Sequence, residues 1–402
     1  MSSSPAPYVD SEVGRLRSVL LHRPGLELAR LTPRNTTQLL FDGVPWMSRA
    51  QAEHDAFAEA LRAHGVEVLL LTELLAQALE VPDARRAVTA DVLADPQLGE
   101  DLGNAVLRYL ESLSVDELCA AMIAGIAKHE LPGGTGIAWA LLDEHDFVVA
   151  PLPNSLFTRD SSMWLRDQVA VSSLALGARK RESSLLGAVY AHHPRFRLSD
   201  RLFTPDLEPL EGGDVLLLAS GTIAIGVGQR TTPAGAERLA RQTFARGLAD
   251  RVLVVPIDQG RSTMHLDTVC TMVDHDAMII YPNVADSMVA YALSAPDGPD
   301  ARLRVDGPEP FLIAVAKAMQ VERIRVIETD LDPVSAEREQ WDDGNNTLCL
   351  APRLAVAYER NQVTNRALEA AGIEVLQIAG SELGSGRGGP RCMSCPITRD
   401  PL

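Results

Sequence analysis

A cysteine near the C-terminal end of the chain follows two arginines, a setting that favours a reactive thiol. Cys392 comes directly after Arg391 and shortly after Arg387, and glycines occupy positions 386, 388 and 389. Nearby cations favour the thiolate over the thiol. Glycines accept positive φ angles and let the backbone pass close to a ligand, so we expect a loop that orders on binding. The tail therefore predicts a nucleophilic cysteine in a binding loop, with an ordinary buried cysteine at a flexible terminus as the alternative.

A second cysteine, Cys395, gives the tail a Cys-x-x-Cys spacing. A zinc ribbon needs a second such pair, and a thioredoxin-like pair opens a helix after a strand near the start of a chain. Neither condition is met, so we assign Cys395 to packing.

Polar side chains recur directly before four apolar runs further up the chain. The four segments are Thr158-Arg159-Asp160-Ser161-Ser162, Glu211-Gly212-Gly213-Asp214, His265-Leu266-Asp267 and Asp343-Gly344-Asn345-Asn346. Each acid alone has a simpler explanation as a cap or a turn residue. Their recurrence at one phase of a repeating pattern predicts a shared site. Carboxylates gathered without lysine repel one another unless something positive lies between them.

Two kinds of positive partner are compatible with these residues. A metal could use a mixed set of oxygen and nitrogen ligands, namely Glu211, Asp214, His265 and Asp267. However, His-x-Asp is a weak metal-binding spacing, and the chain has no His-x₃-His. A planar guanidinium matches paired carboxylates through parallel N–H···O bonds. Cys392 as nucleophile and His265 as its acid–base partner would suit attack at the central carbon of such a group.

The elements that must position these residues form a repeated pattern of apolar hairpin, amphipathic helix and short strand. The expected segments are 16–21, 48–64 and 66–70; 163–165, 169–171 and 182–191; 215–218, 223–226, 234–246 and 252–255; 269–273, 278–281, 311–319 and 324–327; and 348–350, 355–358, 363–371 and 373–378. Five copies predict an α/β fold arranged as a closed ring of repeats, since a doubly wound sheet would alternate single strands with helices. An α+β domain without true repetition is the alternative.

The repeated pattern is interrupted between its first and second copies. Helix-forming runs over 104–112 and 115–129 replace the strands there, punctuated by Pro82, Pro96 and Pro132. We therefore predict a catalytic domain of residues 1–72 and 146–402 and an inserted helical domain of residues 73–145.

The overall composition limits the classes of protein that the chain can belong to. Its 402 residues are 46% hydrophobic and carry a net charge of −17, which argues against a nucleic-acid surface. No apolar run is long enough to span a bilayer, and the start of the chain does not resemble a secretory signal. The five cysteines form an odd, scattered set. We expect a cytoplasmic protein with reduced thiols and no membrane partner.

These motifs together resemble the arginine deiminases, within the group of guanidine-modifying enzymes that fold as a five-bladed α/β propeller. The resemblance runs nearly from end to end and includes the helical insertion. The segments that carry it are Gly14-Arg15-Leu16 to His22-Arg23-Pro24, Phe41-Asp42, Pro153-Asn154 to Arg159-Asp160, Glu211-Gly212-Gly213-Asp214, Met264-His265-Leu266-Asp267 and the Cys392 tail. It implies hydrolysis of L-arginine to L-citrulline and ammonia, without a metal or organic cofactor, through an S-alkylthiouronium on the cysteine.

The resemblance also implies a role for each site residue. Cys392 would be the nucleophile and His265, supported by Glu211, the acid–base group, while Asp160 and Asp267 would bind the guanidinium. The residues implied at the α-amino acid end of the substrate are Asn154, Phe157, Arg179, Asp214, Arg230 and Arg387. Some relatives have a histidine directly before the nucleophile, where this chain has Arg391, so the opening and closing of the tail loop can differ from theirs. Relatives form homodimers or larger assemblies, which implies a homo-oligomer.

Rival functions of two classes stay open on the sequence. An agmatine deiminase or an amidinotransferase could use the same fold, but agmatine has no carboxylate and would leave the three substrate-binding arginines without a role. A non-catalytic arginine-binding protein is the rival from another class. The set of Cys392, His265, Glu211, Asp160 and Asp267 argues against it, because a sensor does not need a nucleophile.

Overall fold

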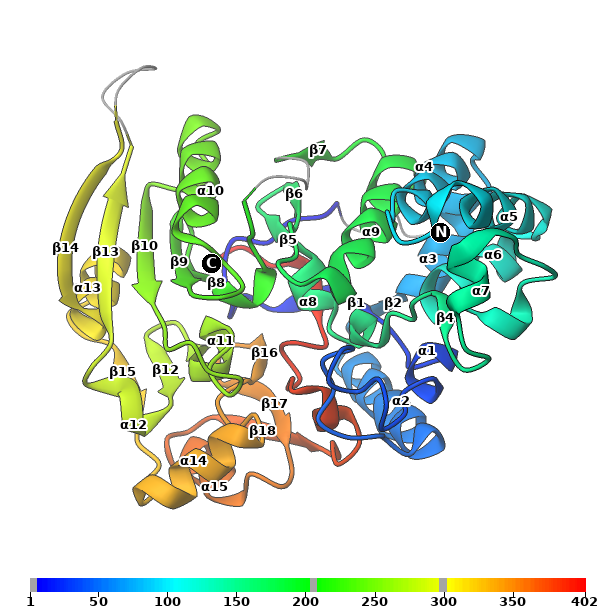
Figure 1. Cartoon of the computed structure of the whole chain (residues 1–402). Coiled ribbons are helices and arrows are strands. Elements are labelled where there is room, and N and C mark those ends of the chain that lie inside the picture. The colour runs from blue at the N-terminus through cyan, green and yellow to red at the C-terminus, as the bar shows by residue number, and fades with distance from the viewer. Residues whose placement is uncertain (1–5, 203–207, 296–301) are drawn as a thin grey trace.

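The computed structural model describes residues 6–202, 208–295 and 302–402, and over these residues the chain has an α/β fold (Figure 1). Short sheets alternate with helices, of which α2 (Met47–Ala63), α10 (Pro233–Ala245), α13 (Phe311–Met319) and α15 (Gln362–Ala370) lie toward the outside. Several strands are buried on both faces, as is usual where helices or other strands cover a sheet from both sides. The expected α/β class is confirmed.

Five sheets share one internal pattern. In each, a first strand runs antiparallel to a central strand, and the central strand runs parallel to a third strand that follows a helix. In that order the strands are β19 (Cys395–Arg399), β1 (Leu16–Leu21) and β2 (Glu67–Leu70); β5 (Ser162–Leu165), β6 (Gln168–Val171) and β7 (Asp200–Arg201); β8 (Val215–Ala219), β9 (Thr222–Val227) and β10 (Arg251–Pro256); β11 (Cys270–Asp274), β12 (Ala277–Ile280) and β15 (Arg325–Ile327); and β16 (Leu348–Ala351), β17 (Leu354–Tyr358) and β18 (Glu374–Ile378). The five predicted repeats therefore correspond to five structural units. Over the described residues no sheet closes on itself, so strand pairing alone does not establish the closed ring.

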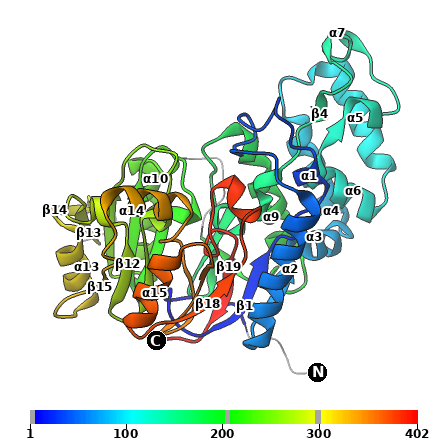
Figure 2. The ribbon, with the colours of Figure 1, turned by 90° about the horizontal axis from the view of Figure 1, so that it is seen from below.

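The first unit is assembled from both ends of the chain. Its sequence offers one strand before the helix, and the missing antiparallel partner is β19 from the tail, with Leu20 opposite Cys395 and Leu16 opposite Arg399. Figure 2 shows β19 beside β1 in the middle of the molecule. This pairing fixes the tail next to the start of the chain and so determines where Cys392 lies.

Two additions to the repeats were not predicted from the sequence. A hairpin of β13 (Val289–Ser294) and β14 (Arg304–Pro310) extends the third sheet through β10. Strand β14 is at the sheet edge and contains Pro308, a residue type that normally argues against a strand. Helix α14 (Pro333–Trp341) precedes the fifth unit and begins at an Asp332 cap, whose side chain accepts from two backbone N–H groups.

The segment between the first and second units is mainly helical, as predicted. It contains α3 (Leu71–Leu79), α4 (Pro82–Leu93), α5 (Gly99–Ser112), α6 (Val115–Ala124) and α7 (Gly136–Leu141). The helix predicted over 115–129 ends earlier, at Ala124, because Gly125 takes a φ of 73° and leaves the helical conformation. Glycine is needed at 125, since a Cβ there would lie 2.3 Å from the carbonyl oxygen of Val149. The chain after it pairs instead as β3 (Ile126–Ala127) with β4 (Phe147–Val149). Helices α3 and α4 pack on α9 (Lys180–His192), and one buried apolar cluster includes residues of these helices and of the second sheet.

Two further short helices lie within units: α1 (Leu26–Ala29) follows β1 in the first unit, and α12 (Pro282–Ala285) follows β12 in the fourth. In the described part of the chain, no helix is both long and apolar enough to cross a lipid bilayer.

Candidate active site

Short segments that precede the first strand of each unit meet near the middle of the molecule (Figure 1). They are α8 (Thr158–Ser161), η4 (Gly212–Asp214), α11 (Leu266–Val269), the turn over 343–347 and the tail before β19. Hydrogen bonds join them in pairs: the Arg159 N–H donates to the carbonyl oxygen of Cys392 at 3.1 Å, and the Leu266 N–H donates to Asp214 at 3.0 Å. The polar segments that recur at one phase of the repeats, from which a shared site was predicted, therefore lie together in space.

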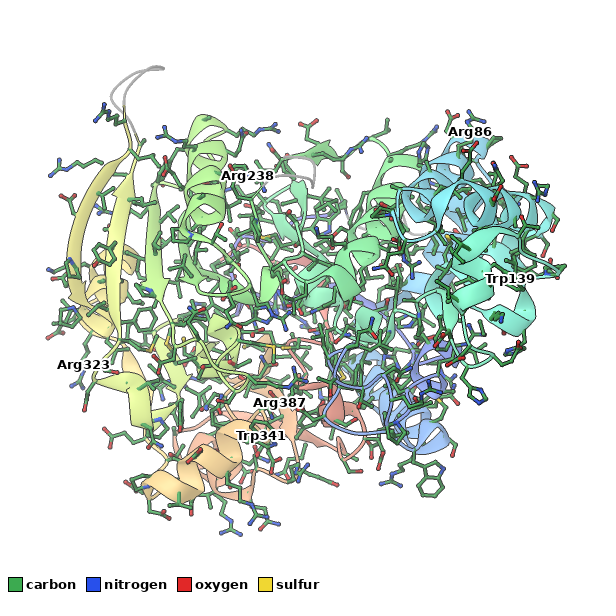
Figure 3. The ribbon with its side chains drawn as sticks, in the orientation of Figure 1. Arg86, Trp139, Arg238, Arg323, Trp341 and Arg387 are labelled. Atoms are coloured by element: carbon green, nitrogen blue, oxygen red, sulfur yellow. The ribbon has the colours of Figure 1, made fainter. Side chains whose placement is uncertain are left out.

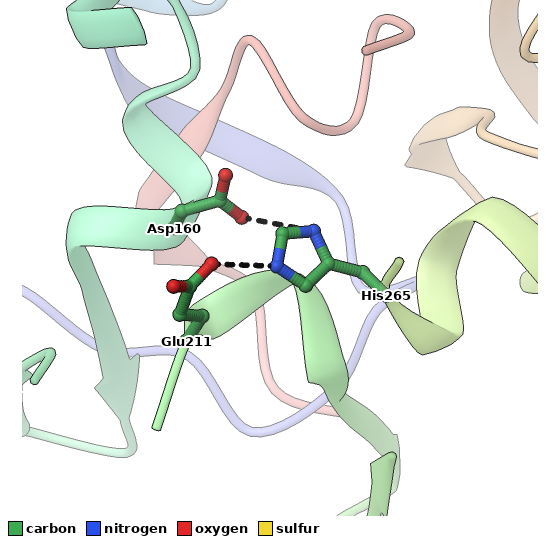
Figure 4. A group of neighbouring side chains, drawn as sticks. All are labelled: Asp160, Glu211 and His265. Atoms are coloured by element: carbon green, nitrogen blue, oxygen red, sulfur yellow. Dashed lines mark hydrogen bonds and ion pairs between the residues drawn. The ribbon is translucent and has the colours of Figure 1, made fainter. Parts of the chain in front are cut away.

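His265 lies between two carboxylates (Figure 4). Its Nε2 is 2.7 Å from Oε2 of Glu211, and its Nδ1 is 3.6 Å from Oδ1 of Asp160. Burial alone would lower the pKa of His265, but Asp160, Glu211 and Asp214 raise it to about 9. The imidazole is therefore protonated at neutral pH and can act as a general acid. Glycine is required at 213, because a Cβ there would lie 2.7 Å from both Asp160 Oδ1 and His265 Nδ1.

Two buried arginines pair with the same carboxylates. Arg179 donates to Oδ2 of Asp160 at 2.6 Å, and Arg230 lies 3.3 Å from Oε2 of Glu211. Burial would raise the pKa of both acids, yet the charges of His265 and the arginines hold it below the ordinary carboxyl value. Both acids are therefore negatively charged at neutral pH.

Cys392 is held against Asp267 by a bridging asparagine. Its Sγ lies 3.5 Å and 3.8 Å from the two carboxylate oxygens of Asp267. The backbone N–H of Cys392 donates to Oδ1 of Asn346 at 3.0 Å, and the side-chain amide of Asn346 donates to the carbonyl oxygen of Asp267 at 2.9 Å. These two bonds fix the thiol beside the carboxylate.

The environment of Cys392 stabilises the neutral thiol, contrary to the expectation from its two arginine neighbours. Burial, followed by the charges of Asp267, Asp160 and Asp343, raises the pKa of Cys392 well above its ordinary value. Arg391 acts in the opposite direction and does not outweigh them. The sequence showed the flanking cations, but it did not show how many acids the fold places around the same sulfur.

Arg391 is a buried part of the site. It donates to Oδ2 of Asp267 at 2.6 Å, to both carboxylate oxygens of Glu12, and to the carbonyl oxygen of Val215 at 2.7 Å. Burial would raise the pKa of Glu12, but Arg391 and Arg159 lower it to about 2. Arg391 therefore balances the charge of Asp267 and ties the tail to the start of the chain.

The tail glycines are needed for close packing and not for positive φ, which corrects the sequence-based interpretation. The positive-φ residue of this loop is Arg387, at 66°. A Cβ on Gly386 or Gly388 would lie 2.7 Å or 2.4 Å from the ring of Phe157, and one on Gly389 would lie 2.8 Å from Asn346. The glycines therefore let the loop lie directly on the site.

The residues predicted for the site divide into two groups. One cavity is lined by Cys392, His265, Asp160, Asn154, Phe157, Arg179, Arg230 and Arg387. Glu211 and Asp267 lie behind this lining and contact His265 and Cys392. The cavity has a volume of about 10 Å³, which is room for no more than a water molecule.

Asp214 lies behind His265 instead of in the lining. It is fully buried, its Oδ1 accepts the Leu266 N–H, and a Cβ on the neighbouring Gly226 would lie 2.5 Å from that oxygen. Burial raises the pKa of Asp214 to about 7. Asp214 is therefore placed to support the turn that carries His265.

Four contributors were not assigned from the sequence. Glu12 and Asn346 hold Arg391 and Cys392, and Arg261 and Met264 line the cavity. Asn346 belongs to one of the recurrent polar segments, so its phase in the repeat was a usable signal. No sequence signal pointed to Glu12, because its partner Arg391 lies almost the whole length of the chain away.

Three side chains of the site lie close enough together to hold a metal ion, and two of them, Glu211 and His265, belong to the metal set considered from the sequence. Ligand atoms of Asp160, Glu211 and His265 lie within 4.8 Å of one another. Arg179 and Arg230 already pair with both of these carboxylates. The charge of the cluster is thus partly balanced by the protein, and the free side of the cavity faces a thiol, which suits an organic cation better than a metal.

The sequence is similar to a known family and to named relatives. The family model for arginine deiminase matches residues 37–399. An arginine deiminase of Rhodococcus opacus (strain B4) is 57% identical over 406 residues, covering 100% of both chains. An arginine deiminase of Rhodococcus erythropolis is 58% identical and one of Mycobacterium tuberculosis is 57% identical, each covering 98% of both chains.

Solved structures show the same fold at much lower sequence identity. DDAH from Pseudomonas aeruginosa, in a cysteine-to-serine mutant complexed with citrulline, superposes with a TM-score of 0.52 at 15% identity and covers 95% of this chain and 99% of its own. SxtG, an amidinotransferase from Microseira wollei, gives a TM-score of 0.55 at 14% identity and covers 98% of both chains. At these identities the likeness concerns the fold alone.

Proposed function

The chain belongs to the arginine deiminase family, and we propose that it hydrolyses L-arginine to L-citrulline and ammonia with Cys392 as the nucleophile. The observation that carries the assignment is that the thiol of Cys392 and a protonated His265 line the same cavity, with carboxylates beside both. A guanidinium is a planar cation that such carboxylates would bind through parallel hydrogen bonds.

Substrate binding would ionise the nucleophile. The carboxylates of Asp160 and Asp267, which raise the pKa of Cys392, are the groups proposed to bind the guanidinium. A cation placed between them would offset their charges and lower the pKa of the thiol at the moment when it is needed. Asp267, 3.5 Å from the sulfur, is placed to accept the released proton.

The first half of the reaction forms a covalent intermediate. The thiolate attacks the guanidinium carbon, which becomes tetrahedral, and His265 donates its proton to the departing nitrogen. Ammonia leaves and an S-alkylthiouronium is left on Cys392. His265 is then neutral beside two carboxylates.

The second half consumes water. Neutral His265 accepts a proton from a water molecule that attacks the same carbon, the C–S bond breaks as the hydroxyl proton of the intermediate passes to solvent, and citrulline forms. The leaving thiolate regains from Asp267 the proton that it gave up, and His265 is again protonated, so the charge of the site is the same before and after one turnover. Glu211, at 2.7 Å, stabilises the protonated form in both halves.

Arg179, Arg230 and Arg387 would bind the α-carboxylate of the substrate, beside Asn154 and Phe157. All five line the cavity, which supports this role. The cavity is too small for arginine as it stands. The tail loop must therefore move outward for access, as the sequence-based expectation of a closing loop requires, and Arg387 would move with it.

The same proposal includes the finer architecture. Five units whose polar segments meet at one place suit a five-bladed α/β propeller with the site on its axis. The division into a catalytic domain and an inserted helical domain of residues 73–145, the homo-oligomer and the cytoplasmic location stay predictions.

Two measurements test the function. The purified protein should release citrulline and ammonia from L-arginine, and protein quenched during turnover should carry on Cys392 the added mass of the thiouronium. Absence of citrulline would refute the activity, and an adduct on another residue would refute the assignment of the nucleophile.

A further inference from the structure

A second cavity borders the tail loop (residues 384–392), which also borders the cavity at Cys392. Its volume is about 310 Å³, within the range of small-molecule sites. Residues of its wall include Trp341, Asp343, Tyr358, Ser381 and Arg387. Among the described residues, Arg387 is the one that lines both this cavity and the cavity at Cys392.

The second cavity contains a buried carboxylate without a partner. Asp343 is 3% exposed, and its Oδ1 has no hydrogen-bond partner among the described residues. Burial raises the pKa of Asp343 to about 7. A buried acceptor that stays unpaired is costly, so a donor from a ligand would be strongly favoured there.

A buried cation with free donors faces the same cavity. Arg387 is 5% exposed, and its guanidinium carbon lies 3.8 Å above the ring of Trp341 (Figure 3). Over the described part of the chain, Nε and Nη2 of Arg387 make no hydrogen bond, and the nearby carboxylate of Asp42 is 3.9 Å from Nε. The stacking on tryptophan holds the charge in place but leaves these N–H groups available.

Three other charged residues of the wall, Asp42, Asp342 and Arg360, are already paired, and Arg338 is exposed. Asp42 lies 2.6 Å from Arg261, and Asp342 lies 3.2 Å from Arg360. The buried groups left for a ligand are therefore one carboxylate, Asp343, and the free donors of Arg387. A ligand that satisfies both carries a negative and a positive group on a small frame.

We propose that this cavity is a second binding site for a free α-amino acid, whose carboxylate pairs with Arg387 and whose ammonium pairs with Asp343. The inference rests on the proposed function, because the substrate arginine and the product citrulline are both such zwitterions. Since Arg387 borders both cavities, a molecule bound in the second one draws Arg387 away from the first, where Arg179 and Arg230 remain to hold an α-carboxylate.

The test counts binding sites for a probe that cannot be consumed. Equilibrium dialysis of radiolabelled L-citrulline against the Cys392→Ser protein should give two molecules per chain, and the added substitution Asp343→Asn should weaken one of them at least tenfold. Asparagine tolerates the φ of 58° at this position, so the variant should fold. The matched control is Asp342→Asn, next in the chain but already paired with Arg360, which should keep both sites.

A single citrulline per chain in the Cys392→Ser protein, or two sites unaffected by Asp343→Asn, would overturn the inference. Labelled L-arginine, tested in parallel, shows whether substrate or product binds more tightly. Turnover of arginine by the unsubstituted protein is measured separately. Failure of turnover refutes the proposed function, whereas turnover combined with one-site binding refutes the second site alone.

Discussion

Replacement of Asp267 by asparagine should make the thiol easier to ionise and the enzyme less active. The charge of Asp267 lies 3.5 Å from Sγ of Cys392. At that distance one unit charge contributes about 5 kcal/mol at an effective dielectric constant of about 20. That energy corresponds to a ceiling of about 3.5 units in the pKa of the thiol. Arg391 offsets part of this charge now and would remain in the variant, so we expect the pKa of Cys392 to fall by at least about 1 unit.

Turnover should change in the opposite sense. The guanidinium would lose one of its two proposed carboxylate partners, and truncation of a buried charge pair costs about 2–5 kcal/mol, which is roughly a 30- to 5,000-fold loss in kcat/KM. The net result would be a better nucleophile in a poorer enzyme.

Two assays separate these effects. The pH dependence of the ultraviolet absorbance of the thiolate, corrected with the Asp267→Asn/Cys392→Ser double variant, gives the pKa, and citrulline formation gives kcat/KM. Burial raises the pKa of Cys119 and Cys349 to about 12 and also raises the pKa of Cys270 and Cys395, and the double variant subtracts the contribution of these four thiols. An unchanged or higher pKa of Cys392, or full activity in Asp267→Asn, would refute the reasoning.

Three further outcomes are expected. Cys392→Ser should abolish turnover with the fold intact and Cys395→Ser should keep most of it, because Cys395 is buried and packed in β19; equal loss in both would contradict this assignment. Glu211→Gln should lower the pKa of His265 from about 9. The raised pKa of His265 gives the native protein a stabilisation that is fully present below pH 6.5 and is lost as pH rises through 9, so the melting temperature should depend less on pH in the variant. An unchanged pH dependence would show that Asp160 and not Glu211 raises the pKa of His265. Arg230→Ala should reduce kcat/KM far more for arginine than for agmatine, which lacks a carboxylate, and an equal reduction would make Arg230 a structural residue.

The sequence determined the repeating units because their signals are local. Alternation of apolar hairpin, helix and strand is set by short-range periodicity, and β5–β6, β8–β9, β11–β12 and β16–β17 form as adjacent hairpins. The polar segments before these strands were found for the same reason. Equivalent positions in successive units point to the same place once the units pack side by side.

The tertiary structure decided which distant residues meet. The pairing of β19 with β1, the contact of Glu12 with Arg391 and the bridge of Asn346 between Cys392 and Asp267 join segments that no local pattern relates. The protonation state of the site also follows from this assembly. The arginines next to Cys392 in the sequence predicted a thiolate, but burial and acids from other units favour the thiol, because electrostatic energy depends on distance in space and on exclusion of water instead of order along the chain.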